Sequence, residues 1–361
     1  MDATRKLHEM GQSLWLDNIT RALLTSGTLR RYIEEFSITG LTSNPTIFDH
    51  AIRNSHDYDS AIAGKLGEGK SGEALFFELA IEDLRGAADL LLPAHEATNR
   101  VDGWVSLEVS PRLAYETRST VAAARHLHAR AARTNVFIKI PGTREGIPAI
   151  EEAIFAGIPI NVTLLFSREQ YVAAAEAYMR GIERRVAARL NPDVPSVASL
   201  FVSRWDAAVA KRAPAYLRNK LGIAVAGRTC RAYRDLLVSD RWLRLANVGA
   251  RPQRMLWAST GTKDPDASDV LYIESLVTPY SINTMPEKTL LALADHGSVA
   301  ATMPNDGGDA EQVLERFTQA GIDLDALAAD LQREGAAAFV ASWNELLDCI
   351  DGKSAQLKKT G

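Results

Sequence analysis

The sequence predicts an α/β fold: a (β/α)₈ TIM barrel with additional helices in the connections between the second and third strands, between the sixth and seventh strands, and at the C-terminal end. Short apolar runs that suit buried strands recur about eight times, and helical pattern follows most of them. No Gly-x-Gly-x-x-Gly sequence follows the first strand, which favours a closed barrel over a doubly wound, dinucleotide-binding sheet.

The predicted strands are runs of four to seven mostly apolar residues. They are Ser13–Asp17, Gly40–Ser43, Val105–Val109, Val136–Ile140, Pro159–Leu164, Ser196–Val202, Arg254–Ser259 and Ser281–Thr284. Stretches rich in Ala, Leu, Glu and Arg at helical spacing lie between them, at Ala74–Leu92, Arg112–Arg133 and Arg168–Arg189. About sixty residues separate the second and third strands, and about fifty separate the sixth and seventh. Neither gap is of low complexity, so we expect extra helices in both.

The chain is expected to form a single barrel domain over residues 1–361, because no Pro-, Ser- or Gly-rich linker divides it. Residues 310–351 are expected to be helices appended to the barrel. Within them we predict two amphipathic helices, as in Ala326–Ala338 and Ser342–Ile350. The polar terminal segment Gly352–Gly361 is expected to fray.

The composition is that of an ordinary globular protein, with 361 residues, 46% hydrophobic, 24% charged, and a net charge of −4. This charge gives no reason to expect a nucleic-acid partner. The distant Cys230 and Cys349 match no metal spacing and are expected to be reduced thiols. No run of about 18 apolar residues predicts a membrane span. The start, Met1–Glu9, lacks the apolar segment of a signal peptide, so we expect a cytoplasmic protein, either monomeric or homodimeric.

The most informative residue is Lys139, in the run Val136–Gly142. Four residues of this run are apolar and a Pro-Gly breaker ends it, so Lys139 is predicted to lie on a short buried strand. Burial disfavours the charged form of an amine, and a neutral lysine amine can attack a carbonyl to form a Schiff base. The alternative is a structural ion pair between Lys139 and a carboxylate.

Polar residues occur where the predicted strands end, which in a barrel is the catalytic face. They are Asp17, Asn44, Glu108, Lys139, Asn161, Thr163, Ser199, Arg204, Ser259 and Lys263. Several of them also have a purely structural interpretation. Asp17 could cap a helix, Asn44 could belong to a turn, Glu108 could form an ion pair, and the two later cations could be solvated surface groups. Their recurrence at the strand ends favours a single site.

A metal or organic cofactor is not expected. His126 and His128 lie on what we predict to be a solvated helix, and no His-x-x-Glu-His cluster or similar ligand set occurs. The segment Asn305–Asp309 resembles a calcium loop only superficially, because it lacks the spacing and the terminal Glu of that motif.

Four segments are similar to strand motifs of the transaldolases: Thr39–Phe48, Val105–Val109, Ile138–Thr143 with Gly146, and Ile160–Ser167. The likeness extends from about Leu14 to about Pro286 in the same order. The tail Gly321–Ile350 also resembles that of the longer bacterial members. The resemblance implies a (β/α)₈ barrel that transfers a dihydroxyacetone unit in the non-oxidative pentose phosphate pathway. The donor would be sedoheptulose 7-phosphate or fructose 6-phosphate, and the acceptor glyceraldehyde 3-phosphate or erythrose 4-phosphate.

The resemblance also implies roles for the strand-end residues. Lys139 would form the Schiff base, and Glu108 would move protons through a water that Thr163 helps to hold. Asp17 would take the proton of the C4 hydroxyl. The substrate would be bound by Asn44, Asn161 and Ser199, and its phosphate by Arg204 and Ser259, with Lys263 replacing an arginine that many members carry where this chain has Gly261.

Two other functions compete with this interpretation. A fructose 6-phosphate aldolase shares the chemistry, but that subgroup has a shorter chain and uses a tyrosine or glutamine in proton transfer. Glu108 and the long insertions argue against it. A barrel that only binds sugar phosphates would not need a buried lysine with two carboxylates near it.

Overall fold

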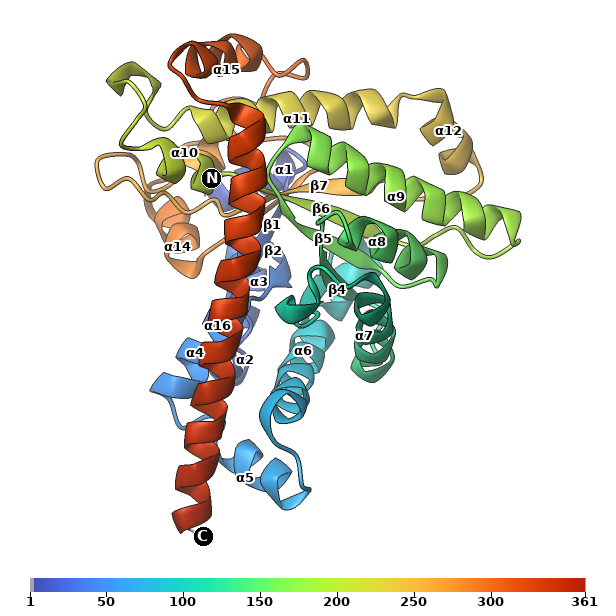
Figure 1. Cartoon of the computed structure of the whole chain (residues 1–361), viewed down its shortest axis with the longest axis vertical. Coiled ribbons are helices and arrows are strands. Elements are labelled where there is room, and N and C mark those ends of the chain that lie inside the picture. Colours follow the sequence, from blue (N-terminus) through green and yellow to red (C-terminus); the bar gives the residue numbers. More distant parts are fainter. Residues whose placement is uncertain (1–2, 361) are drawn as a thin grey trace.

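The computed structural model, which describes residues 3–360, is a closed barrel of eight parallel strands surrounded by helices (Figure 1). The strands are β1 Ser13–Asp17, β2 Ile38–Thr42, β3 Trp104–Glu108, β4 Val136–Pro141, β5 Ile160–Leu165, β6 Ser196–Phe201, β7 Gln253–Ala258 and β8 Ile282–Met285. Each strand pairs with its neighbour in sequence, and β8 pairs with β1 to close the barrel. The predicted fold class is confirmed, and every predicted strand boundary lies within two residues of the observed one.

The helices before β5 are α1 Ala3–Glu9, α2 Arg21–Thr25, α3 Thr28–Phe36, α4 Pro45–Asn54, α5 Asp59–Gly67, α6 Gly72–Ala97, α7 Thr117–Ala131 and α8 Gly146–Phe155. Those after β5 are α9 Arg168–Ala187, α10 Ser203–Val209, α11 Leu221–Leu237, α12 Asp240–Asn247, α13 Leu271–Ser275, α14 Glu287–His296, α15 Ala310–Gln319 and α16 Leu324–Thr360. Short 3₁₀ turns occupy Pro111–Leu113 and Ala215–Leu217. The extra helices predicted in the two long connections are therefore present, as α4 and α5 before α6, and as α10 to α12.

Near the amino-terminal ends of the strands, the interior of the barrel is filled by the side chains that point into it. Strand alternation places every second residue inside. The apolar interior positions are Trp15, Trp104, Phe137, Val197, Leu256 and Ile282. Gly40 faces the Trp15 indole so closely that an added Cβ would lie 2.4 Å from a ring atom, so only glycine fits there. These large rings close the amino-terminal end of the barrel. The polar residues therefore form the layer at the carboxyl-terminal ends of the strands.

The C-terminal region differs from the prediction of two helices. α16 is one continuous helix, and it crosses the strands before running on along α4 and α5 (Figure 1). The segment Phe339–Ala341 between the two predicted helices contains no Gly or Pro that would end a helix. Residues 352–360 of the segment expected to fray belong to α16, and Lys353 Nζ donates to Asp59 Oδ1 at 2.6 Å; Gly361 lies outside the described residues.

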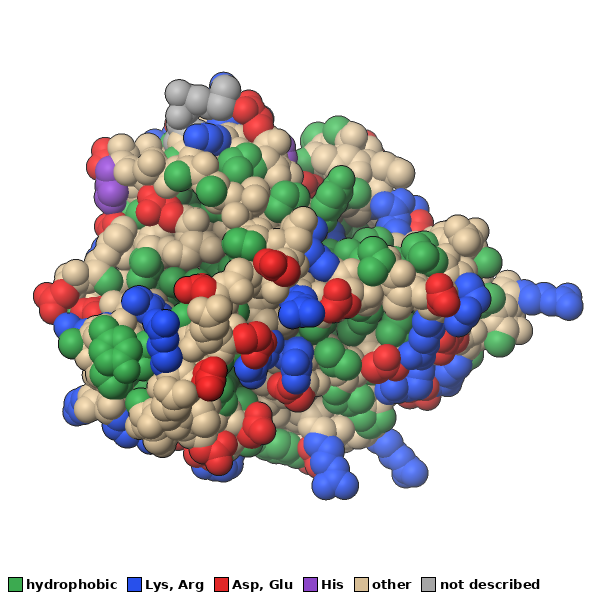
Figure 2. Space-filling view, turned by 90° about the horizontal axis from the view of Figure 1, so that it is seen from above, with side chains coloured by type: hydrophobic (Ala, Val, Ile, Leu, Met, Phe, Trp, Pro, Cys, Tyr) green, Lys and Arg blue, Asp and Glu red, His purple; other side chains and the backbone are tan. Residues whose placement is uncertain are grey.

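Met1, Asp2 and Gly361, which belong to the predicted domain of residues 1–361, lie outside the described residues. Within residues 3–360, none of the helices combines the length and the apolarity that crossing a lipid bilayer requires. On the face drawn in Figure 2, acidic and basic side chains are interspersed rather than gathered by sign.

Candidate active site

The register of the barrel brings the predicted catalytic side chains together. Glu108 and Lys139 are direct partners across β3 and β4, and Asp17 is the partner of Thr42 across β1 and β2. Thr163 pairs with Pro141 across β4 and β5. All the strands are parallel, so these residues lie at the same, carboxyl-terminal end of the barrel.

Lys139 is buried, with 6% of its surface exposed, as the sequence predicts. Its Nζ donates hydrogen bonds to the Ser43 carbonyl at 3.1 Å and to Glu108 Oε1, with which it forms an ion pair. The structure therefore contains the ion pair between Lys139 and a carboxylate that was the alternative to a neutral lysine. A lysine that pairs with a carboxylate does so as an ammonium group, whereas the nucleophile in Schiff-base formation is the neutral amine. Before it can act as a nucleophile, Lys139 must lose a proton.

Glu108 is suited to accept that proton. Burial raises the pKa of the Glu108 carboxyl above its ordinary value, and the Lys139 charge offsets only part of this effect. A carboxylate with a raised pKa binds a proton more tightly than one in water. Transfer of the proton from Lys139 to Glu108 would remove two buried charges at once and leave a neutral amine.

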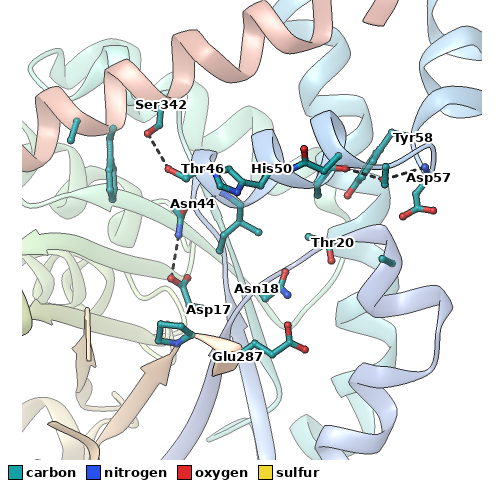
Figure 3. Close-up of a pocket in the computed structure, with 18 of the residues that line it drawn as sticks. Asp17, Asn18, Thr20, Asn44, Thr46, His50, Asp57, Tyr58, Glu287 and Ser342 are labelled. Atoms are coloured by element: carbon teal, nitrogen blue, oxygen red, sulfur yellow. Dashed lines mark hydrogen bonds between the residues drawn. The ribbon is translucent and has the colours of Figure 1, made fainter. Parts of the chain in front are cut away.

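Asp17 is the second carboxylate of the site. It accepts hydrogen bonds from Thr42 Oγ1 at 2.8 Å and from Asn44 Nδ2 at 3.2 Å, the second of which is drawn in Figure 3. Burial raises the pKa of Asp17, while the Lys139 charge and these two hydrogen bonds act in the opposite direction. Asp17 does not cap the next helix, because Thr20 is the N-cap of α2.

Asn44 has two roles in this geometry. Its Oδ1 accepts a hydrogen bond from the Ile47 backbone at 3.2 Å and caps α4, in agreement with the turn interpretation. Its Nδ2 donates to Asp17, so the cap also fixes the carboxylate.

Thr163 lies beside the ion pair. Only 3% of its surface is exposed, and its Oγ1 has no hydrogen-bond partner among the described residues. Together with Glu108 and Lys139 it lines a cavity of about 20 Å³. A cavity needs roughly 10–15 Å³ to hold one water molecule, and these three side chains supply the polar partners that such a water requires.

Asn161 lies one layer deeper in the barrel. It is fully buried, donates from Nδ2 to Ser106 Oγ at 3.1 Å, and accepts from Ser199 Oγ at 2.7 Å. Ser199 lines the cavity that Lys139 also lines, whereas Asn161 is not in its wall. The predicted contact of Asn161 with a substrate hydroxyl therefore stays a prediction.

The cavity above Lys139 has a volume of about 140 Å³ and is lined on one side by Arg204, Ser259 and Lys263. The Arg204 guanidinium lies over the Phe201 ring at 5.4 Å and the Phe339 ring at 6.0 Å, and no carboxylate pairs with it among the described residues. A half-buried cation without a counter-ion suits an anionic ligand.

The other two predicted phosphate contacts are less enclosed. Ser259 adopts a left-handed backbone conformation (φ 54°), and its Oγ lies 3.0 Å from Ser203 Oγ. Lys263 is exposed although it lines the cavity, so its role stays a prediction.

A wider cavity of about 670 Å³ opens outward from the site (Figure 3). It shares Asp17, Asn44, Arg204 and Phe339 with the inner cavity and extends along α4 toward Tyr58. Because the two cavities share these lining residues, the inner cavity opens on this side into the outer one.

Two residues of α16 at the site could not be found from the sequence. Phe339 lines the inner cavity above Lys139, the outer cavity and the small cavity beside Thr163. Gln332 Nε2 donates to the Gly142 carbonyl at 3.0 Å and to the Leu164 carbonyl at 2.9 Å. Leu164 has a left-handed backbone conformation (φ 59°) at an irregularity in the pairing of β5. Gln332 thus fastens α16 over the ends of β4 and β5, which no local pattern in the sequence indicates.

Comparison with known proteins agrees with this geometry. The family model described as "Transaldolase/Fructose-6-phosphate aldolase" matches residues 14–350. A protein of Arthrobacter sp. (strain FB24) named transaldolase is 44% identical, over 99% of this chain and 98% of its own length. A transaldolase of Mycobacterium tuberculosis is also 44% identical, over 94% of each chain. "Transaldolase 2" of Nostoc sp. is 39% identical over 96% of each. The chain therefore belongs to the transaldolase/fructose-6-phosphate aldolase family.

Proposed function

We propose that this protein is a cytoplasmic transaldolase of the non-oxidative pentose phosphate pathway, acting through a Schiff base on Lys139. It transfers a dihydroxyacetone unit from sedoheptulose 7-phosphate or fructose 6-phosphate to glyceraldehyde 3-phosphate or erythrose 4-phosphate. The observation that carries the proposal is the buried Lys139 beside Glu108, in a cavity that Asp17 also lines. An amine, a proton acceptor and a second carboxylate are the groups that Schiff-base cleavage requires.

The reaction begins with proton transfer from Lys139 to Glu108. The neutral Nζ attacks the ketone carbon C2, and the proton that the attacking nitrogen then loses passes to the carbonyl oxygen to give a carbinolamine. Glu108 then returns its proton to the departing hydroxyl group through a water held by Thr163. Water leaves and a protonated Schiff base remains, which is the electron sink for the next step.

Carbon–carbon cleavage follows at Asp17. Its carboxylate removes the proton of the C4 hydroxyl, and the C3–C4 bond breaks. The electron pair of this bond moves into the Schiff base to form an enamine. The first aldehyde leaves, and the acceptor aldehyde is attacked by the enamine carbon. Asp17 gives its proton to the new hydroxyl, and hydrolysis of the new Schiff base releases the product ketose. Asn44 and Thr42 hold Asp17 in position through both steps.

We expect Asp17→Asn to lower kcat by about 10²–10⁴-fold, which is the range for loss of a positioned proton-transfer group. The same variant should be more stable than the parent protein at neutral pH. The folded-state pKa of Asp17 is raised, so ionisation of this group costs stability in the folded state. The difference should be small at a pH below the ordinary value of 3.8 and should grow as the pH rises through the raised value. Thermal denaturation from pH 3 to pH 8 measures this difference, and a difference that stays constant over the range would contradict the raised pKa of Asp17.

We expect Phe339→Ala to convert part of the transferase activity into simple aldol cleavage. The Phe339 ring lines the cavity shared by Lys139 and Arg204, so its loss would let water protonate the enamine. Release of free dihydroxyacetone without acceptor should rise about tenfold, the equivalent of about 1.4 kcal/mol in barrier height. Phe339→Leu, which keeps an apolar cover, should behave like the parent protein. Equal release from both variants would remove this role.

Lys263→Ala should raise KM for phosphorylated substrates by about two- to fivefold with little change in kcat. An exposed ion pair contributes roughly 0.5–1 kcal/mol, which gives this range. Lys263→Arg should retain the parent KM. Lys211→Ala, at another exposed lysine, serves as the matched control. An unchanged KM in Lys263→Ala would make this residue a solvated surface group.

A coupled assay tests the proposed function itself. Sedoheptulose 7-phosphate and glyceraldehyde 3-phosphate are supplied together, and the formation of erythrose 4-phosphate is measured. An acceptor-free control measures free dihydroxyacetone. Erythrose 4-phosphate formation that depends on the acceptor supports a transaldolase, whereas release of dihydroxyacetone at the same rate without acceptor would indicate an aldolase.

A further inference from the structure

A pair of buried threonines lies next to the Asp17 carboxylate. Thr42 is the last residue of β2 and Thr284 lies on β8, and these two strands flank β1 in the barrel. Both side chains point into the barrel, because Gly40 and Ile282, two residues earlier on the same strands, face the interior. The two hydroxyl oxygens are 2.7 Å apart, which is the usual length of a hydrogen bond between hydroxyl groups.

The direction of this hydrogen bond follows from the other contact of Thr42. A hydroxyl group carries one hydrogen, and the Thr42 hydroxyl donates it to Asp17 Oδ1 at 2.8 Å. An ionised carboxylate can only accept, so Thr42 has no hydrogen left for Thr284. Thr284 is therefore the donor of the pair. The two hydrogen bonds run in one direction, from Thr284 through Thr42 to Asp17.

The protein holds Thr284 in place for this contact and shields it. Only 5% of the surface of Thr284 and 3% of that of Thr42 are exposed, so bulk water has almost no access to the pair. The backbone of β8 is fixed at the same residue, because Thr260 Oγ1 donates to the Thr284 carbonyl at 2.8 Å. Loss of the Thr284 hydroxyl would therefore leave the Thr42 oxygen without a donor to replace it.

The two linked hydrogen bonds favour the ionised form of Asp17. A hydroxyl group that accepts a hydrogen bond becomes a stronger donor, by about 10–30% per bond. Burial raises the pKa of Asp17, and the hydrogen bond from Thr42 is one of the contacts that oppose this effect. By strengthening the Thr42 hydrogen bond, Thr284 helps to keep Asp17 as the carboxylate that can take a proton from the C4 hydroxyl.

Other charged or titratable groups also face Asp17. They line the inner or the outer cavity with it, or belong to the buried ion pair, and are Lys139, Glu108, Arg204, Lys263, Glu287, His50 and Asp57. Within residues 3–360, no hydrogen bond joins any of them to the Thr42 or Thr284 hydroxyl. An uncharged substitution of Thr284 removes none of these charges, so its effect on the pH dependence of turnover reports on the hydrogen bonds.

We propose that Thr284 is a positioning residue of this site, which acts through Thr42 to hold the Asp17 carboxylate in the state that accepts a proton. The inference rests on the proposed function, because it assigns Thr284 to the step that Asp17 performs. Thr284 acts through another side chain rather than on the substrate, so its hydroxyl should affect turnover and not substrate binding.

Thr284→Val removes the hydroxyl and keeps the branched shape of the side chain. We expect kcat in the coupled assay to fall about two- to tenfold with an unchanged KM, the range for loss of one hydrogen bond. The low-pH limb of the kcat profile should move to higher pH, because a weaker donor raises the pKa of Asp17 and protonated Asp17 cannot act as a base. Thr284→Ser should restore both. Thr39→Val, at a buried threonine near the start of β2, is the matched control and should behave like the parent protein.

A double-mutant cycle with Thr42→Val separates this role from a purely structural one. If Thr284 acts through Thr42, Thr284→Val should change kcat less than twofold in the Thr42→Val background. If Thr284 only supports β8, the losses of the two single variants should multiply, and the inference would be wrong.

Two further results would overturn the inference: a parent-like kcat and pH profile in Thr284→Val, or a Thr284→Ser variant that restores neither. If thermal denaturation shows that Thr284→Val does not fold, Thr284→Ala, which also lacks the hydroxyl, takes its place in the same measurements. A parent protein without transferase activity would refute the proposed function and this inference with it. An active parent protein with an unaffected Thr284→Val variant would refute this inference alone.

Discussion

Replacement of Lys139 by alanine is expected to lower turnover by at least about a thousandfold, because Lys263, the other lysine in the cavity wall, is exposed and is not paired with Glu108. The measurement is kcat in the coupled assay. Lys220→Ala, at an exposed lysine, is the matched control. If the Lys139→Ala variant kept nearly the activity of the parent protein, Lys139 could not be the residue that forms the Schiff base.

The stability of this variant needs its own control. Removal of one partner from a buried ion pair can cost about 3–5 kcal/mol, because the other charge is left unpaired. Glu108 can lower this cost by taking up a proton, since burial raises its pKa. The variant Lys139→Met combined with Glu108→Gln leaves no buried charge at the pair and should unfold near the temperature of the parent protein. If this double variant is folded and inactive, the loss of activity is chemical rather than structural.

Arg204→Ala is expected to raise KM for phosphorylated donors by about 10- to 150-fold, because hydrogen bonds to charged groups contribute roughly 1.5–3 kcal/mol. Its guanidinium is held between Phe201 and Phe339 without a carboxylate partner, so its donors remain free for a phosphate. Turnover of fructose, which has no phosphate, should change little. KM and kcat for both donors provide the measurement.

The controls for Arg204 separate geometry from charge. Arg204→Lys keeps the charge but loses the paired donors, and should recover only part of the affinity. Arg212→Ala removes an exposed arginine nearby in sequence and should have no effect. An equal loss with fructose and with fructose 6-phosphate would show that Arg204 supports the fold of the site rather than the phosphate.

Much of the barrel could be predicted from the sequence because each strand carries its own signal. A short run such as Val136–Ile140, which is rich in β-branched residues and is followed by Pro-Gly, is typical of a buried strand, and a polar residue near its end is then expected at the rim. This reasoning brought Asp17, Glu108, Lys139 and Thr163 to one end of the barrel, where the structure places them.

The remaining features depend on contacts between distant segments. The ion pair between Lys139 and Glu108 follows from the register of β3 and β4. From the sequence alone, both an ion pair and an unpaired neutral amine were possible for Lys139. The position of Phe339 depends on α16 being continuous and on Gln332 fastening it to the strand ends. A separate cavity of about 510 Å³ lies at the amino-terminal ends of the strands. It forms between these strand ends and the helices α11 and α12, which no local sequence pattern brings together.

The most direct test of the covalent mechanism is reduction with borohydride in the presence of fructose 6-phosphate, followed by mass spectrometry of the digested protein. We predict one three-carbon adduct per chain, on the peptide that contains Lys139, and none on the Lys139→Ala variant. An active parent protein that carries no adduct, or carries it on a different lysine, would contradict the assignment of Lys139 as the residue that binds the substrate covalently.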